Sequence, residues 1–264
     1  MRQGLPRLDP PAGREGAQGS LDRADPAAPA HPPGASVKTL ADYLFWEEPG
    51  IQLYCGDCRE LLPLVDAANA LVTDPPFGIS WPRATWADAE RDYPELIRWL
   101  VRESARVVPI GWCFVFQTML NVGRFHEWFP PGWRLFAACK NFAQVRPTGV
   151  WHSWDPVVFW RNGPHSGPNS GPHSGHVNRD YFVGNVAGSF GERTEHPCPR
   201  PVDTMRHIVG LAAPVNGRVI DPFAGSGTTL LAAKEMGRQV VGIEIEPRWC
   251  ELAVKRLRQG VLPL

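Results

Sequence analysis

The sequence contains no hydrophobic run long enough to cross a membrane. A transmembrane helix needs roughly 18 or more consecutive apolar residues, and no segment of the 264-residue chain reaches that length. The N-terminus also lacks the pattern of charged and then apolar residues that marks a secretory signal. We therefore expect a cytoplasmic protein that makes no membrane contact.

The chain has no excess of charge of either sign. Lys and Arg together number 27, as do Asp and Glu, so the formal net charge is zero at pH 7. This balance excludes a uniformly basic surface of the kind that often marks nucleic-acid-binding proteins. It does not exclude a local basic face, because the field near a cleft depends on where the charges lie.

Paired metal-binding cysteine motifs are also missing. The six cysteines are scattered, and only Cys55 and Cys58 form a CxxC, with no second CxxC or paired histidine motif to complete a zinc site. Several cysteines fall in apolar segments, which is typical of buried, reduced thiols in a cytosolic protein. We expect no metal ion.

Two segments lack large apolar side chains. Residues 1–36 are rich in Pro, Ala, Gly and charge, and such a segment cannot bury enough surface to offset its ordering entropy, so we expect disorder. Residues 163–175 repeat a GPHS unit, which predicts a loop, and a flexible histidine array lacks the fixed geometry of a metal site. We interpret 37–264 as one domain, with 161–195 as a short low-complexity insertion.

The remaining sequence alternates between strand-like and helix-like patterns. Short apolar runs bounded by turn residues predict strands, and apolar spacing of three and four predicts helices. Such alternation is typical of an α/β fold, with helices on both faces of the sheet. We expect strands at 51–54, 68–73, 112–116, 133–142, 154–160, 218–220 and 240–243, and helices at 57–64, 93–107, 202–211, 230–236 and 249–257.

A glycine-rich motif, DPFAGSGTT at residues 221–229, follows one predicted strand and opens a helix. Gly225 and Gly227 permit a tight turn and a close approach of a ligand to the backbone. Glu244 ends the next strand, where an acidic side chain can accept hydrogen bonds from ribose hydroxyls. The third glycine of the dinucleotide fingerprint is absent, which favours a cofactor with one nucleoside. The alternative is a plain strand-to-helix turn.

A second motif, TDPPFG at residues 73–78, ends a buried strand. Pro75 and Pro76 hold the chain extended and remove two N–H donors. Asp74, the carbonyls of this stretch and the Phe77 ring then offer two acceptors and a stacking surface. A planar amino group on a heteroaromatic ring needs these groups. The alternative is a proline-stiffened turn with Phe77 in the core.

With both motifs present, the sequence resembles the DNA amino-methyltransferases over roughly residues 51–257. The DPPF motif precedes DPFAGSGTT, which is the order of the beta group of that family. Supporting segments are CGDCRELL at 55–62, HPCPRP at 196–201 and VGIEIEP at 241–247. Phe77 stands where tyrosine is commoner, and Arg200 stands where lysine is usual. The segment in which the family reads its target is short here.

The resemblance implies a Rossmann-like fold that uses S-adenosylmethionine, with a mixed, mostly parallel sheet and permuted motif order. The strands that end at Asp74 and Asp221 would lie side by side, with the cofactor at their carboxyl ends. It implies catalytic roles for Asp74, Pro75, Pro76 and Phe77. It implies cofactor-binding roles for Asp57, Asp74, His196, Arg200, Asp221, Phe223, Gly225, Ser226, Gly227, Thr228 and Glu244.

The implied reaction is methylation of N6 of adenine in double-stranded DNA. The target base would be flipped out of the duplex, and Asp74 and the Pro75 carbonyl would accept its two amino hydrogens while Phe77 holds the ring. Methylation of N4 of cytosine uses the same geometry, but that group more often begins its motif with serine. RNA or protein-amide methylation and a non-catalytic DNA-binding relative are further alternatives.

The sequence predicts the DNA-contacting residues less clearly than those of the cofactor site. Basic residues between positions 134 and 161 would meet phosphates, and two tryptophans after Phe77 would close over the flipped base, with Gly78 as a hinge. The resemblance leaves a homodimer and a cognate restriction endonuclease open as partners. The residues concerned are Arg134, Lys140, Arg146, Arg161, Trp81 and Trp86.

Overall fold

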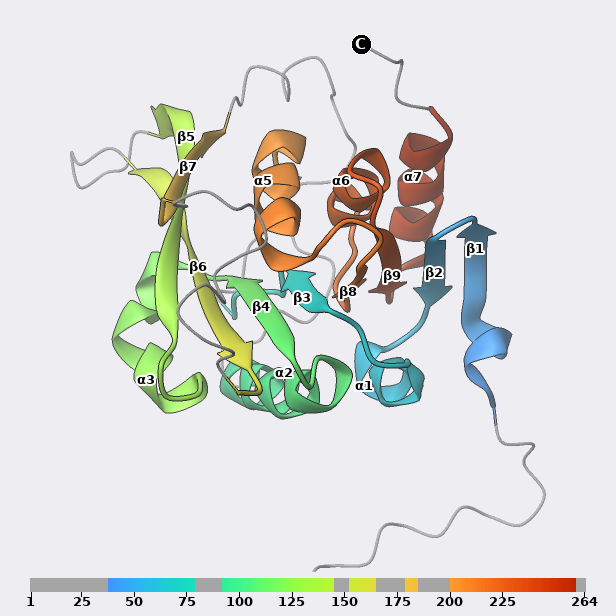
Figure 1. Cartoon of the computed structure of the whole chain (residues 1–264), viewed down its shortest axis with the longest axis horizontal. Coiled ribbons are helices and arrows are strands. Elements are labelled where there is room, and N and C mark those ends of the chain that lie inside the picture. The colour runs from blue at the N-terminus through green and yellow to red at the C-terminus, as the bar shows by residue number, and fades with distance from the viewer. Residues whose placement is uncertain (1–37, 79–91, 145–151, 165–178, 185–199, 260–264) are drawn as a thin grey trace, which may run out of the picture. The chain divides into compact units, whose positions relative to one another are not determined.

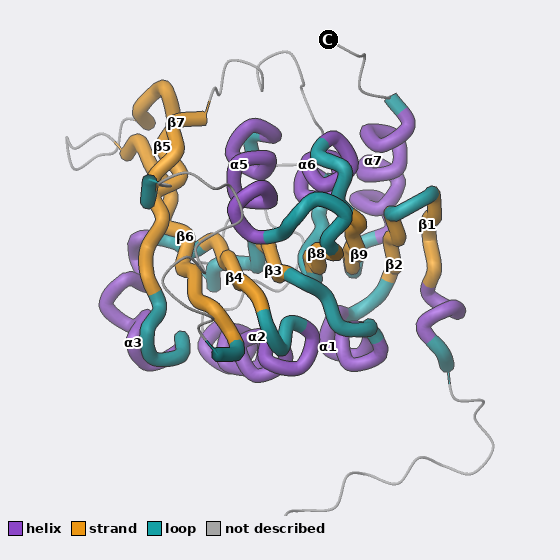
Figure 2. The backbone as a smooth tube through the Cα atoms, viewed as in Figure 1, coloured by secondary structure: helices purple, strands orange, loops and turns teal. Residues whose placement is uncertain are grey.

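One mixed sheet organises the computed structural model, which describes residues 38–78, 92–144, 152–164, 179–184 and 200–259. Within these residues the strands lie in the order β1-β2-β9-β8-β3-β4-β6-β5-β7 (Figures 1 and 2). The described residues all belong to one compact unit that begins at Lys38. The strands are β1 (Leu44–Glu48), β2 (Ile51–Cys55), β3 (Ala70–Thr73), β4 (Gly111–Phe116), β5 (Arg134–Gln144), β6 (His152–Asn162), β7 (Tyr181–Gly184), β8 (Arg218–Asp221) and β9 (Gln239–Glu244).

The middle of the sheet is parallel and both sides carry antiparallel pairs. Strand β3 pairs in parallel with β4 and β8, and β9 pairs in parallel with β8 and β2. Strands β1 and β2 pair antiparallel, as do β4 and β6, and β5 and β6. The prediction of a mixed, mostly parallel sheet is therefore confirmed.

Helices cover both faces of this sheet. Figure 1 shows α5 (Val202–Ala212), α6 (Thr228–Glu235) and α7 (Pro247–Arg258) on one face, and α1 (Cys58–Leu61), α2 (Tyr93–Val107) and α3 (Phe125–Trp128) on the other. Side chains alternate between the two faces along each strand. Thus Val72 packs in the cluster beneath α5, α6 and α7, whereas its neighbour Leu71 packs in the cluster beneath α1, α2 and α3.

The chain leaves β3 and β8 in opposite directions. After β3 the polypeptide forms α2 and returns as β4, next to β3. After β8 it forms α6 and returns as β9, which lies next to β8 on the side away from β3. These crossovers cover opposite faces (Figure 1). Neighbouring parallel strands whose connections diverge leave a crevice at their carboxyl ends, which is where α/β proteins bind ligands.

Most of the expected elements are present, with shifts of a few residues. The predicted helix at 93–107 has the same bounds as α2, and its first turn contains Pro94, which suits that position because an N–H there has no helical partner. At the beginning of the described part, Thr39 and Asp42 form a capping box before a 3₁₀ turn. Strands β1 and β7 and helix α3 were not predicted.

The expectations for some segments concern residues outside the described part. These include the disorder expected for 1–36 and most of the repeat in 161–195. Strand β7, which does lie inside that insertion, pairs in parallel with β5 at the edge of the sheet. No helix in the described ranges is long and apolar enough to span a bilayer.

Candidate active site at the carboxyl ends of β3 and β8

The two sequence motifs meet where β3 and β8 end. Leu71 of β3 pairs with Ile220 of β8 in parallel register. Two residues beyond Leu71, the Thr73 hydroxyl donates a 2.6 Å hydrogen bond to Oδ1 of Asp221, which follows Ile220 directly. The expectation that the strands ending at Asp74 and Asp221 are neighbours is therefore confirmed.

Asp221 is a buried carboxylate that ties the motifs together. Its side chain also accepts hydrogen bonds from the backbone N–H of Phe223, at 3.1 Å, and from the Thr229 hydroxyl. Burial raises the pKa of Asp221 to about 6, although these hydrogen bonds act in the opposite direction. Because Asp221 is only 2% exposed, its contacts are with the protein's own motifs.

The glycine-rich turn requires glycine for two reasons. Gly225 and Gly227 have φ of 50° and 77°, which is left-handed backbone that side chains disfavour. At Gly227 a Cβ would also lie 2.7 Å from Cβ of Ala253 in α7. The close approach that we expected to serve a ligand therefore serves, at Gly227, the packing of the turn against α7.

A buried arginine from α7 holds the same turn. Arg256 is 6% exposed, and its Nη1 donates to the Ser226 carbonyl at 2.8 Å and to Oγ1 of Thr228 at 3.0 Å. Sequence reasoning missed this residue. The signal was present, because helical spacing puts Arg256 on the same face as Trp249 and Ala253, which are both buried.

Glu244, at the end of β9, also fixes this turn. Its Oε2 accepts the N–H of Gly225 at 2.8 Å, and its Oε1 accepts the N–H of Glu246 at 2.9 Å. Burial raises the pKa of the Glu244 carboxyl. The Glu244 carbonyl accepts the N–H of Gly56 at 2.9 Å, which draws the segment of Asp57 to the same edge. Asp57 itself caps α1 by accepting the N–H of Arg59.

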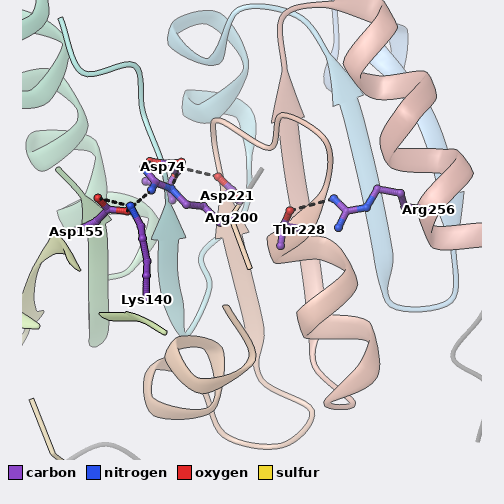
Figure 3. A network of polar contacts seen from close by, with 8 residues as sticks. Asp74, Lys140, Asp155, Arg200, Asp221, Thr228 and Arg256 are labelled. Atoms are coloured by element: carbon purple, nitrogen blue, oxygen red, sulfur yellow. Dashed lines mark hydrogen bonds and ion pairs between the residues drawn. The ribbon is translucent and has the colours of Figure 1, made fainter. Parts of the chain in front are cut away.

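On the other side of the site, Asp74 is paired with Arg200. Nε of Arg200 lies 2.6 Å from Oδ2 of Asp74, and Nη2 lies 3.0 Å from Oδ1, so the guanidinium grips both carboxylate oxygens. Both side chains are largely buried, with 25% of Asp74 and 11% of Arg200 exposed. The structure thus places Arg200, which we expected near the cofactor, against the carboxylate of the DPPF motif (Figure 3).

Charged residues of β6 and β5 extend the Asp74–Arg200 ion pair. Nη1 of Arg200 donates to Asp155 at 2.6 Å, and Nζ of Lys140 lies 3.0 Å from the same oxygen of Asp155. Sequence reasoning missed Asp155 and considered Lys140 only for DNA phosphates. The available signal was a lone carboxylate inside the apolar run 154–160, which needs a nearby cation if it is buried.

Phe77 lies half-buried beside this ion pair. The Arg200 guanidinium lies over its ring at 5.4 Å from the centroid and over the ring of Phe116, the last residue of β4, at 4.8 Å. Asn121 donates a 3.2 Å hydrogen bond to the Phe77 carbonyl. Within the motif Pro75 is buried and Pro76 is half-buried.

Burial divides the candidate cofactor residues into two groups. Those with accessible surface are Asp57, Asp74, Arg200, Phe223 and Gly225, and those buried are Asp221, Ser226, Gly227, Thr228 and Glu244. A ligand at this edge would touch the first group, with the second group holding the shape of the turn. Ile245, which the sequence did not single out, is 55% exposed and adds an apolar surface beside Glu244.

Several expected contacts cannot be placed in the site. His196, Trp81, Trp86 and Arg146 lie outside the described residues. Of the other basic candidates, Arg134 donates to the carbonyls of Gly132 and Trp133, and Arg161 donates to that of Pro164. Among the described residues, no cluster of three or more His, Cys, Asp or Glu side chains is placed to hold a metal ion.

Comparison with known proteins relates part of this chain to the DNA methylases. Residues 135–255 match the family model described as DNA methylase. The chain is 44% identical over 66 residues to the Type II methyltransferase M.ScaI of Streptomyces caespitosus, covering 25% of this chain and 22% of that protein. It is 44% identical over 62 residues to the Type II methyltransferase M.HindIII of Haemophilus influenzae, covering 24% and 20%. These matches span only about a fifth of either relative.

Solved structures are similar over much more of the chain. A crystal structure of the M1.HpyAVI–SAM complex superposes with a TM-score of 0.60 at 23% identity, covering 78% of this chain and 99% of that one. The PvuII DNA methyltransferase, titled cytosine-N4-specific, gives a TM-score of 0.59 at 16% identity, covering 78% and 86%. The fold is therefore that of the Rossmann-like methyltransferases. Residues 135–255 match the DNA methylase family model, and the order of the two motifs resembles that of the beta group of the DNA amino-methyltransferases.

Proposed function

We propose that this protein transfers a methyl group from S-adenosylmethionine to N6 of adenine in double-stranded DNA. The observation that carries the proposal is the pairing of β3 with β8, which brings the DPPF motif and the glycine-rich turn to one edge of the sheet. One motif offers acceptors for an amino group, and the other offers a turn with accessible backbone and a neighbouring carboxylate. Together these are the two halves of a methyl-transfer site.

The residues around the glycine-rich turn fit the proposed cofactor. Phe223 and Gly225 are accessible at the turn, while Glu244 holds the Gly225 N–H and lies one residue from the exposed Ile245. Phe223 and Gly225 would line the methionine portion and Asp57 the adenine, while the buried Ser226, Gly227 and Glu244 would hold the turn that presents them. When bound, S-adenosylmethionine supplies an electrophilic methyl group on a sulfonium.

The DPPF motif would hold the target base. The Asp74 carboxylate and the Pro75 carbonyl would accept the two hydrogens of the amino group, so that its nitrogen lone pair turns toward the methyl donor. Phe77 would stack on the base after it is flipped from the duplex. The residues contribute positioning and electrostatic support, and no covalent bond to the protein is required.

Methylation of N4 of cytosine is the second candidate. It has the same chemistry, and the similar PvuII structure is titled cytosine-N4-specific. Adenine is favoured because the motif begins with Asp74, where the cytosine group more often has serine. A non-catalytic DNA-binding relative is a third candidate. Double-stranded DNA is the proposed partner, and a homodimer or a cognate restriction endonuclease would be consistent with the Type II relatives.

A nucleoside digest distinguishes these candidates. The protein is expressed in a host that lacks DNA methylation, and methylated bases are quantified by mass spectrometry with Asp74→Ala as the control. We expect N6-methyladenine with the wild type and none with the variant. N4-methylcytosine would overturn the choice of base. Absence of both, in a folded protein that binds S-adenosylmethionine, would favour the non-catalytic relative.

A further inference from the structure

Four charged side chains form a continuous chain that begins at the DPPF motif. They are, in order, Asp74, Arg200, Asp155 and Lys140, joined by ion pairs of 2.6, 2.6 and 3.0 Å. Carboxylates and cations alternate, so the chain is electrically neutral as a unit. At least three quarters of each side chain is buried, since the exposed fractions are 25%, 11%, 14% and 17%.

This chain of ion pairs crosses the sheet over the end of β4. Asp74 follows β3, and Asp155 lies on β6, with β4 between these two strands. The Arg200 guanidinium spans this gap while lying 4.8 Å from the ring centroid of Phe116, the last residue of β4. The Arg200 guanidinium therefore packs on the Phe116 ring and pairs with a carboxylate on each side, which leaves the planar group little freedom to rotate.

The far end of the chain fixes Asp155 in turn. Asp155 pairs with Ala138 of β5, and Lys140 stands two residues further along the same strand. A diagonal pair of this kind is within reach of a long side chain. Asp155 and Lys140 thus sit on the body of the sheet, whereas Arg200 precedes α5 in a connecting segment. Residues of two paired strands therefore hold the arginine through Asp155.

We propose that Arg200 is a positioning residue that orients the Asp74 carboxylate toward the target amino group, and that Asp155 orients Arg200. This inference rests on the proposed methyl transfer. It replaces the cofactor contact that the family resemblance implied for Arg200. The bidentate grip sets the plane of the carboxylate, so the acceptor for the amino group is in place before the base arrives.

Kinetics separate this role from a cofactor contact. Asp155→Asn keeps the size of the side chain but loses its charge, and Arg200→Lys keeps the charge but cannot bridge two carboxylates. We expect each to lower the single-turnover methylation rate by about tenfold to a hundredfold, with the Kd for S-adenosylmethionine changed less than about twofold. Asp155→Glu should restore part of the rate. A weaker Kd with an unchanged rate at saturating cofactor would overturn the proposal.

A second arginine of the protein provides a matched control. Arg206 also bridges two carboxylates, Asp203 and Glu235, but Glu235 ends α6 at the opposite end from the glycine-rich turn. Glu235→Gln removes a carboxylate from this second bridge. We expect no change in methylation rate, and an equal loss in Glu235→Gln and Asp155→Asn would show that the effect is only structural.

A second readout does not need activity. The Nε–H proton of Arg200, identified by the loss of its NMR signal in Arg200→Lys, should exchange slowly with water in the full chain without ligands. Asp74→Asn and Asp155→Asn should speed that exchange, whereas Glu235→Gln should not. Fast exchange in the wild type overturns the proposed chain of ion pairs. Slow exchange in a protein that methylates no DNA overturns the proposed function and leaves the ion pairs standing.

Discussion

The two sides of the site are held by different kinds of interaction. On the Asp74 side, charged side chains from three distant segments pair with one another, and part of each is accessible (Figure 3). On the glycine-rich side, the side chains of Arg256 and Glu244 bond to the backbone of the turn and are almost fully buried. The ion pairs orient side chains that keep some accessible surface, whereas the buried turn cannot loosen without disturbing the core.

This difference predicts different consequences for mutations on the two sides. Changes at the glycine-rich turn should affect folding and cofactor binding together. Changes in the ion-pair chain should affect methyl transfer with a smaller effect on stability, because each single variant leaves at least one ion pair of the chain in place.

Gly227→Ala should have the largest effect. The variant must place a side chain on left-handed backbone and within 2.7 Å of Ala253, which together should lower the free energy of unfolding by about 3 kcal/mol. Urea unfolding measures this loss. Gly237→Ala is the control, because Gly237 has φ of 67° but no atom within 4 Å of the added Cβ. Equal losses would contradict the role of the contact with α7.

Asp221→Asn should change how stability depends on pH. The folded-state pKa of about 6 lies above the ordinary 3.8, so the wild type's Asp221 contributes stability below about pH 4 that is lost as pH rises through 6. Relative to Asp221→Asn, the wild type should lose up to about 3 kcal/mol between pH 4 and pH 7. Urea unfolding of both proteins across this range gives the difference, and a constant difference would contradict the burial argument.

Arg256→Met should destabilise the glycine-rich turn from α7. Loss of the charge-assisted bonds to Ser226 and Thr228 should cost about 2 kcal/mol of unfolding free energy and weaken the binding of S-adenosylmethionine. Calorimetry measures both. Arg258→Met, in the same helix but over the ring of Trp46, should leave cofactor binding unchanged. If the two variants bound the cofactor alike, Arg256 would not support the turn.

Lys140→Met should have the smallest effect on stability, about 1 kcal/mol, because Asp155 keeps its ion pair with Arg200. It removes the outermost cation of the chain and leaves Asp155 paired with Arg200. Methylation should slow less than in Asp155→Asn. Added salt should narrow the gap between wild type and variant only slightly, because these pairs are largely buried. A loss as large as that of Asp155→Asn would place Lys140 closer to the chemistry than the structure indicates.

The local hydrophobic pattern predicted the central strands of the sheet well. The strands β3, β4, β8 and β9 are buried on both faces, so they read as short apolar runs bounded by turns. The motifs were placed correctly because each follows such a strand, and parallel strands end at a common edge. Strand β7 was missed because only one of its four residues is buried and its pairing with β5 is not local.

The supporting contacts of the site could not be predicted in the same way. Arg200 lies 126 residues from Asp74, and Arg256 lies 30 residues from Ser226. No periodicity links such residues, and their partners follow only from the order of the strands. The resemblance gave Arg200 a cofactor role from its place in a motif, and only the sheet topology puts it between Asp74 and Asp155.

The most direct test of this account is a single-turnover experiment with Asp74→Asn. Cofactor labelled in its methyl group is bound first, and transfer to a duplex is then followed in the wild type and the variant. We expect the variant to fold and bind S-adenosylmethionine with nearly the wild-type Kd, while transfer falls by at least about a hundredfold. Transfer at the wild-type rate, or loss of cofactor binding together with transfer, would contradict a site with two separately supported sides.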